Sequence, residues 1–216
     1  MTAFPRAEVL DSLGMFAATA ALPEQVAAAV APAQGLPGLP DHEYVEQVVV
    51  LGMGGSGIAG DLMVAVAGPF LPVPVVVVKS YDLPDFVGPG SLVFALSFSG
   101  DTEETVEAAG EAAGAGANVV VVTSGGELAR LAQEWGSPVV PVPAAIPQPR
   151  AALGAMAVPP LIVLEEMGLF PGARRWAELA VDQLARRRDA LVVPGNEAEV
   201  LARTIGRTIP LVHGAQ

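Results

Sequence analysis

Five short runs of valine and leucine, separated by patterns typical of helices, constrain the fold of this chain more than any other feature. The runs are nearly continuous in apolar residues, which is typical of strands that are buried on both faces. Strands that alternate with helices imply parallel pairing through right-handed crossovers. The sequence therefore predicts a three-layer α/β fold with a parallel sheet of about five strands. The predicted strands are 47–51, 73–79, 92–97, 118–123 and 138–142.

The segments around these strands divide the chain into four predicted parts. A helical segment with a Pro/Gly-rich linker occupies 1–45, and the core domain occupies 46–170. A helical connector occupies 171–208, and 209–216 has the pattern of the first strand of a second, truncated α/β domain. The predicted helices are 7–20, 23–31, 58–67, 103–115, 127–135, 150–167, 173–190 and 197–207.

The composition excludes several classes of protein. Hydrophobic residues make up 52% of the chain, which is ample for a buried core. The uncharged run 62–78 is interrupted by three prolines, and the run 151–164 is short and holds Pro159 and Pro160, so we expect no membrane span. The N-terminus lacks the pattern of a secretory signal, and the absence of cysteine excludes disulfides and thiolate metal sites. We expect a soluble, cytoplasmic protein.

The charge is strongly negative and unevenly spread. The net charge is −12, with sixteen acids and three bases in 1–149 and eight bases and seven acids in 150–216. No basic face is indicated, so we expect no nucleic-acid partner. Lys79 is the only lysine, so an anion bound by the first part must be held mainly by backbone amides and hydroxyls. The two histidines, His42 and His213, are far apart, and we expect no metal site and no cofactor.

Two loops rich in glycine and hydroxyls follow the first and third predicted strands, at 52–57 and 97–102. The carboxyl ends of parallel strands lie at one edge of a sheet, so we expect the two loops to meet there. Each loop precedes a predicted helix, and a helix N-terminus attracts anions through its unpaired N–H groups and its dipole. Gly100 lets the backbone approach a ligand closely. The hydroxyls that can donate to phosphate oxygens here are those of Ser97, Ser99, Thr102 and Thr105.

The first loop also fits a dinucleotide-binding pattern, since Gly52, Gly54 and Gly57 satisfy G-x-G-x-x-G after a strand. That interpretation predicts an acid at the end of the next strand, but this strand ends at Lys79 with Asp82 beyond it. NAD is therefore disfavoured, and NADP stays open as an alternative. A helix N-terminus with two converging loops suits a phosphomonoester better than a pyrophosphate.

The second loop has a purely structural alternative. Thr102 or Asp101 can cap the helix while the serines satisfy their own turn. Four hydroxyls within nine residues nevertheless favour a phosphate site. A carboxylate beside a phosphate is unfavourable, so we expect that of Asp101 to turn away or to cap the helix. Glu103 favours the helix dipole, whereas Glu104 could face the ligand.

Four ordered motifs carry a family resemblance: Gly-Met-Gly-Gly-Ser-Gly at 52–57, Ser-Phe-Ser-Gly-Asp-Thr-Glu-Glu-Thr at 97–105, Thr-Ser-Gly-Gly at 123–126 and Pro-Arg-Ala-Ala-Leu-Gly at 149–154. In this order and spacing they resemble the bifunctional phosphoglucose/phosphomannose isomerases of the sugar isomerase (SIS) domain superfamily. The resemblance covers roughly residues 45–216. It implies a SIS-type fold, two tandem domains and a homodimer.

The resemblance also implies a reaction and a site. The family moves a proton between C1 and C2 of a sugar 6-phosphate, converting glucose 6-phosphate or mannose 6-phosphate into fructose 6-phosphate. Arg150 is the implied catalytic residue, where its charge could stabilise an enediolate. The implied phosphate-binding residues are Gly54, Gly55, Ser56, Ser97, Ser99 and Thr102.

The resemblance leaves part of the chemistry unassigned. In the family the catalytic glutamate, histidine and lysine lie beyond the position of Gln216, and His213 is not the family's histidine. Asp101 replaces the commoner asparagine, which could weaken phosphate binding. We therefore expect the 216-residue chain to bind a sugar phosphate and fail to isomerise it. The alternative is a non-catalytic SIS module that binds sugar phosphates for regulation.

Overall fold

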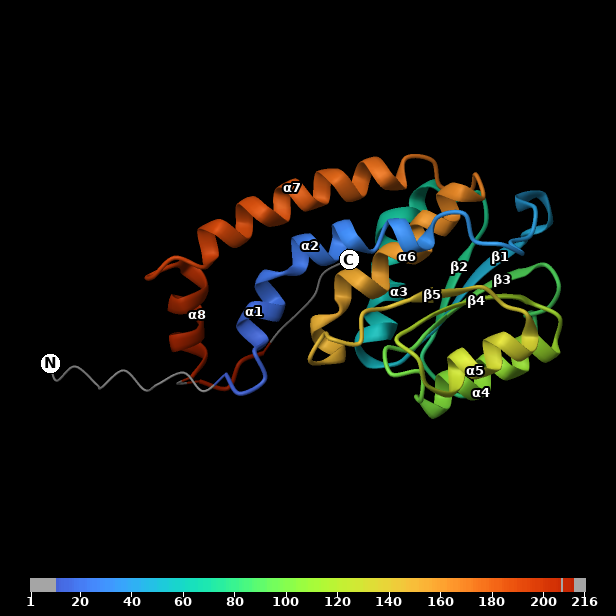
Figure 1. The fold of residues 1–216 in the computed structure, drawn as a ribbon, viewed down its shortest axis with the longest axis horizontal. Helices are drawn as coiled ribbons and strands as arrows, with labels where there is room; N and C mark the ends of the chain where they lie inside the picture. Colours follow the sequence, from blue (N-terminus) through green and yellow to red (C-terminus); the bar gives the residue numbers. More distant parts are fainter. Residues whose placement is uncertain (1–10, 207, 212–216) are drawn as a thin grey trace, which may run out of the picture.

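The computed structural model, which describes residues 11–206 and 208–211, is built around a five-stranded parallel sheet (Figure 1). The strand order is β2-β1-β3-β4-β5, and every neighbouring pair is parallel. The strands are β1 (Gln47–Leu51), β2 (Val75–Val78), β3 (Ser91–Leu96), β4 (Asn118–Thr123) and β5 (Val139–Pro141). The predicted α/β class, the five strands and their parallel pairing are confirmed.

The strands bury alternate side chains in two separate cores. Val48 and Val50 of β1 face one core, and Val49 and Leu51 face the other. The first core is covered by α3 (Gly54–Ala67) and α6 (Leu153–Glu166), and the second by α4 (Glu103–Gly114) and α5 (Gly126–Trp135). Figure 1 shows the two helix pairs on opposite faces of the sheet. This is the predicted three-layer arrangement.

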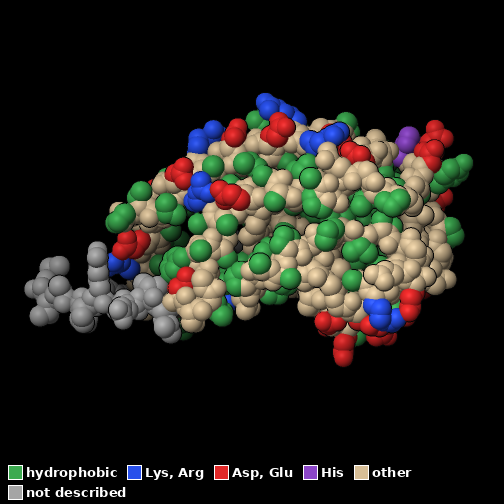
Figure 2. All heavy atoms as spheres, viewed as in Figure 1, with side chains coloured by type: hydrophobic (Ala, Val, Ile, Leu, Met, Phe, Trp, Pro, Cys, Tyr) green, Lys and Arg blue, Asp and Glu red, His purple; other side chains and the backbone are tan. Residues whose placement is uncertain are grey.

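An outer layer of helices lies against α6. α2 (Leu22–Ala28) contacts both α6 and α7 (Ala173–Leu191), and Arg188 Nη1 lies 2.6 Å from Glu24 Oε1 across the α2–α7 pair. α1 (Met15–Ala20) precedes α2, and α8 (Glu197–Ile205) follows α7. In the view of Figure 2, charged side chains of both signs line the surface over α7, and acidic side chains gather over α4 and α5. Helix α2 thus packs between α6 and α7 on the helical side of the domain.

Helix α6 is the most buried helix on the face of the sheet that α2, α3 and α7 also cover. Ten of its residues are buried, and Pro159 and Pro160 lie inside it. With 14 residues it is about 21 Å long, too short for a bilayer. Across residues 11–206 and 208–211, no helix combines the length and the hydrophobicity that a membrane crossing needs.

Several predicted boundaries differ from the structure. α3 begins at Gly54, four residues before the predicted start. The first helix begins at Met15, residues 11–14 precede it without helical structure, and the earlier part of the prediction falls outside the described residues. In the segment predicted as a strand of a second domain, 209–211 have no regular secondary structure, and the remainder also falls outside the described residues.

Candidate functional site

The two predicted ligand loops meet where the strand order reverses. β1 pairs directly with β3, with Leu51 opposite Ala95. From this central pair the strand order runs outward in opposite directions, to β2 beside β1 and to β4 beside β3. In open parallel sheets, ligands bind outside the carboxyl ends of the strands at this reversal. A β-carbon added at Gly52 would lie 3.1 Å from the carbonyl oxygen of Leu96, so the ends of β1 and β3 are in contact. The sheet topology therefore places both loops at one edge.

The first loop brings α3 unusually close to β1. Gly54, the first residue of the helix, has φ +51°, and a β-carbon at Gly57 would lie 2.7 Å from the carbonyl oxygen of Gly52. Ser56 is buried in this first turn. No described side chain caps the helix at Met53, so its first N–H groups are left for another acceptor.

The second loop, residues 97–102, is called the hydroxyl loop, and its own serines hold its shape. Ser97 is 1% exposed, and its Oγ accepts a hydrogen bond from the Gly100 N–H at 3.1 Å. The same oxygen lies 3.0 Å from Thr102 Oγ1. The exposed Ser99 accepts from the Asp101 N–H at 3.2 Å, whereas Thr102 precedes α4 without capping it through its side chain. Ser99 and Thr102 are thus the more accessible hydroxyls, and the N-terminus of α4 lacks a side-chain cap.

A third loop, residues 123–126, is hydrogen-bonded to the hydroxyl loop. The backbone N–H of Ser124 and its Oγ both donate to the carbonyl oxygen of Phe98, at 3.0 and 2.6 Å. The Leu128 N–H donates to the carbonyl oxygen of Gly100 at 2.9 Å. Gly100 has φ +82°, and a β-carbon there would overlap the carbonyl oxygen of Gly125. Sequence reasoning did not find this contact, although Thr-Ser-Gly-Gly is one of the four motifs of the resemblance.

Asp101 turns away from its own helix. Its Oδ1 accepts a hydrogen bond from the Glu127 N–H at 2.9 Å, at the N-terminus of α5. A β-carbon at Gly126 would lie 2.7 Å from this oxygen, so only glycine fits there without a shift. The carboxylate of Asp101 thus bonds to α5 and not to α4, the helix that follows its own loop. Consequently α5 is capped by a carboxylate, whereas α3 and α4 have no side-chain cap.

Arg150 lies beside the start of α3. It belongs to the 3₁₀ helix η4 (Pro149–Ala151), and a β-carbon at Gly55 would lie 3.8 Å from the Arg150 Cα. The guanidinium is exposed, and its recorded hydrogen bond joins Nη1 to Gln148 Oε1 at 3.4 Å. The N-terminal helix α1 also contacts η4. The structure therefore brings Arg150 to the same edge as the two ligand loops.

The other singled-out residues are engaged elsewhere. Lys79 Nζ lies 2.5 Å from Asp61 Oδ2 of α3, so the only lysine is paired with a carboxylate. His42 precedes β1, at the opposite edge of the sheet, and its Nδ1 lies 3.2 Å from Asp41 Oδ1. Within the described ranges, no three His, Asp or Glu side chains are placed to hold a metal ion.

Glu104 is half-buried in the first turn of α4. Partial burial, followed by the charges of Glu104 and Glu103, raises the pKa of Tyr81 above its ordinary value. Tyr81 Oη also lies 3.5 Å from Glu103 Oε2. The acidic start of α4 therefore faces the segment after β2. Whether Glu104 also faces a bound ligand stays a prediction.

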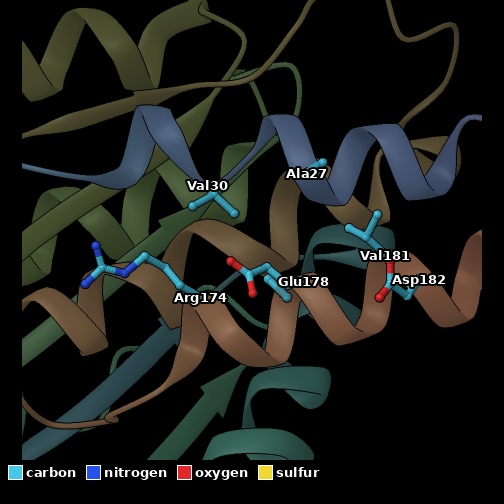
Figure 3. Close-up of a pocket in the computed structure, with 7 residues that line it drawn as sticks. Ala27, Val30, Arg174, Glu178, Val181 and Asp182 are labelled. Atoms are coloured by element: carbon cyan, nitrogen blue, oxygen red, sulfur yellow. The ribbon is translucent and has the colours of Figure 1, made fainter.

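A groove of about 360 Å³ lies away from this edge, between α2 and α7 (Figure 3). Ala27 of α2 and Val30, which follows the end of α2, face the side chains of α7 in this groove. Its full lining is Ala27, Val30, Arg174, Ala177, Glu178, Val181 and Asp182. It shares no residue with the predicted phosphate site.

Comparison with known proteins identifies the family. Residues 45–137, which include the first four strands and both ligand loops, match the SIS domain family. The chain contains a SIS domain. The C-terminal domain of glucosamine-fructose-6-phosphate aminotransferase from Francisella tularensis has the same fold, with a TM-score of 0.64 and 17% identity over 95% of this chain and 60% of that chain.

The resemblance to the bifunctional phosphoglucose/phosphomannose isomerases is also confirmed. The SIS chain is 34% identical over 93% of its length to the protein of that name from Caldicellulosiruptor bescii. It is 40% identical over 53% of its length to the one from Thermoplasma volcanium. The chain covers 60% of the first relative and 35% of the second, so it spans well under the full length of both.

Proposed function

We propose that this SIS chain binds the phosphate group of a sugar 6-phosphate for an aldose–ketose isomerase. The observation that carries the proposal is the convergence of two helix N-termini without side-chain caps, those of α3 and α4, with the hydroxyl loop at the reversal of the strand order. The relatives' name, bifunctional phosphoglucose/phosphomannose isomerase, supports phosphorylated glucose and mannose as substrates. We propose glucose 6-phosphate and mannose 6-phosphate, interconverted with fructose 6-phosphate.

The proposed phosphate site relies on amides and hydroxyls. Two helix dipoles with unpaired N–H groups favour a dianion without a cationic side chain. Ser99 and Thr102 donate to the phosphate oxygens, while the buried Ser97 donates in the liganded state or keeps the loop in shape. Gly54, Gly55 and Ser56 provide the second wall of the site from α3.

Arg150 is proposed as the catalytic cation. In aldose–ketose isomerisation a base removes the C2 proton of the aldose, which leaves an enediolate, and a proton is then returned to C1. The backbone of Arg150 lies beside Gly55, and we propose that its guanidinium stabilises the negative charge of this enediolate. Among the described residues, the Arg150 side chain makes one hydrogen bond, at 3.4 Å to Gln148, which leaves further donors available for the substrate.

We assign no general base. The described residues at this edge include no histidine, and Lys79 is held in its ion pair with Asp61. We therefore predict that the chain binds fructose 6-phosphate without turning it over, and that a complete active site requires further groups from a homodimer or a second domain. The same observation favours the alternative function, a non-catalytic SIS module that binds sugar phosphates for regulation.

Calorimetric titration with fructose 6-phosphate, together with isomerase assays on glucose and mannose 6-phosphates, tests the proposal. Ser99→Ala combined with Thr102→Ala should weaken binding by about 3–6 kcal/mol, because two hydrogen bonds to a charged group are lost and each contributes about 1.5–3 kcal/mol. The control is Ser137→Ala, since Ser137 precedes β5 and so lies at the opposite end of the sheet, where the strands begin. Unchanged affinity in the double variant would remove the site from this loop. Turnover by the chain would instead show that Glu104 or another described residue supplies the base.

A further inference from the structure

We infer that Ser124 and Asp101 are positioning residues, which hold the hydroxyl loop in the shape that binds phosphate while touching no ligand themselves. We further infer that the two properties of Asp101 act in opposite directions: its hydrogen bond strengthens phosphate binding and its charge weakens it. The inference rests on the proposed function, because it assigns roles around the same phosphate site.

The hydroxyl loop is hydrogen-bonded through its backbone to loop 123–126 and to the first turn of α5. The carbonyl oxygen of Phe98 accepts from Ser124, and that of Gly100 accepts from Leu128 of α5. Since these carbonyls point toward loop 123–126 and α5, their negative ends are directed away from an anion held at the opposite side of the loop. Ser124 contributes two of the three hydrogen bonds, one through its backbone and one through its side chain. Removing its hydroxyl should therefore loosen the loop without removing a ligand contact.

Asp101 connects the same loop to α5. Its backbone N–H is bonded to Ser99 Oγ, and its Oδ1 accepts from the Glu127 N–H. The carboxylate thus fixes the position of the chain between the two accessible hydroxyls. The positive end of the α5 dipole stabilises the negative charge there. That charge nevertheless lies within the hydroxyl loop, where an exposed carboxylate repels a nearby phosphate, most strongly at low salt.

Two neutral replacements separate the hydrogen bond from the charge. Asp101→Asn keeps an oxygen that can accept from Glu127 N–H and removes the charge, whereas Asp101→Ala removes both. The difference in affinity between Asp101→Asn and Asp101→Ala therefore reports the hydrogen bond. The difference between Asp101→Asn and the wild type reports the charge. Glu111→Gln is the matched control for charge, because Glu111 is an exposed acid in the C-terminal half of α4, the helix that follows the hydroxyl loop.

The experiment is calorimetric titration of fructose 6-phosphate into the 216-residue chain and these variants, at low and at physiological salt. Asp101→Asn should bind about two- to tenfold more tightly than the wild type at low salt, with a smaller gain as salt screens the charge. Asp101→Ala should bind at least about threefold more weakly than Asp101→Asn, and Ser124→Ala about three- to tenfold more weakly than the wild type. Glu111→Gln and Ser137→Ala should match the wild type, and thermal unfolding verifies that every variant is folded.

The possible outcomes separate this inference from the proposed function. Equal affinities for Asp101→Asn and Asp101→Ala, with Ser124→Ala unchanged, would overturn the positioning roles while leaving the phosphate site in place. A gain with Glu111→Gln as large as that with Asp101→Asn would overturn the local effect of the Asp101 charge. No binding of fructose 6-phosphate by the wild-type chain would overturn the proposed function, and the positioning roles with it.

Discussion

Replacing Gly100 by alanine tests whether the hydroxyl loop and loop 123–126 are locked together. The residue has φ +82°, which costs a non-glycine residue about 1–2 kcal/mol. The new β-carbon would overlap the carbonyl oxygen of Gly125 and lie 2.9 Å from Thr123 Oγ1. Because the obstacle is backbone, no side-chain rotation relieves the overlap, and the loops must move apart.

The cost of that movement follows from the contacts it breaks. Separating the loops sacrifices up to three hydrogen bonds, from Ser124 N, Ser124 Oγ and Leu128 N, each contributing about 0.5–1.5 kcal/mol. Together with the backbone strain, Gly100→Ala should lower the free energy of unfolding by about 2–5 kcal/mol. For a chain of this size that corresponds to a melting temperature lowered by roughly 5–15 °C.

Thermal unfolding followed by circular dichroism measures this effect, and Gly110→Ala is the control. Gly110 lies inside α4, where a β-carbon would meet only Trp135 Cζ2 at 3.8 Å. Alanine should stabilise this helix by about 0.5–1 kcal/mol. If Gly100→Ala unfolded within about 2 °C of the wild type, the loops could separate freely and the reasoning would be wrong.

Three further changes test the core, the lysine and the outer layer. Phe94→Ala, at a fully buried position in β3, should lower the free energy of unfolding by about 3–5 kcal/mol in a denaturant titration, and a loss below about 1 kcal/mol would contradict its place in the core. Lys79→Met removes an exposed pair with Asp61, so stability should change by at most about 1 kcal/mol. Affinity for fructose 6-phosphate should also stay unchanged in Lys79→Met, and a large loss would make Lys79 a ligand. The hydrogen bond from Arg188 lowers the pKa of Glu24 in the folded protein. The ionised Glu24 therefore contributes to stability above its pKa in the unfolded chain, and this contribution is lost as the pH falls through the depressed pKa. Glu24→Gln should therefore melt below the wild type near neutral pH, and the difference should vanish in acid; a constant difference would exclude the linkage.

The sheet could be predicted because each strand is a short apolar run that can be recognised from its own residues. β3 is buried at all six positions, and a run such as Leu92–Leu96 has no polar face to place in water. Parallel pairing then follows from the helices between the strands. The position of the loops at one edge follows in turn, since it depends only on where each strand ends.

The early start of α3 could not be predicted from local preference. Gly54, Gly55 and Gly57 are poor helix formers, and they suggest a loop as far as Ile58. Tertiary packing decides instead, because a β-carbon at Gly57 would lie 2.7 Å from the carbonyl oxygen of Gly52. One at Gly60 would lie 2.9 Å from Val50 Cγ1. These glycines allow the helix to lie closer to β1 than larger residues would permit.

The site was only partly predictable for a similar reason. Hydroxyls and glycines predict a phosphate site in the hydroxyl loop, and the structure brings this loop and Arg150 to the same end of the sheet. The partner of Asp101, however, is the N–H of Glu127, 26 residues later in the chain. Nothing in the local sequence specifies which helix the carboxylate caps. Whether Ser97, which is already hydrogen-bonded inside the loop, also contacts phosphate stays a prediction.

The two outermost strands, β2 and β5, differ in how readily a further strand could pair with them. β5 has only three residues and ends on Pro141, which has no N–H to offer a further strand. β2, at the other edge, has four consecutive valines, and three of them are only partly buried. A strand from another molecule could therefore extend the sheet far more readily beside β2 than beside β5. Aggregation of a partly unfolded chain should accordingly begin at Val75–Val78, and a charged residue there would be the natural means to slow it.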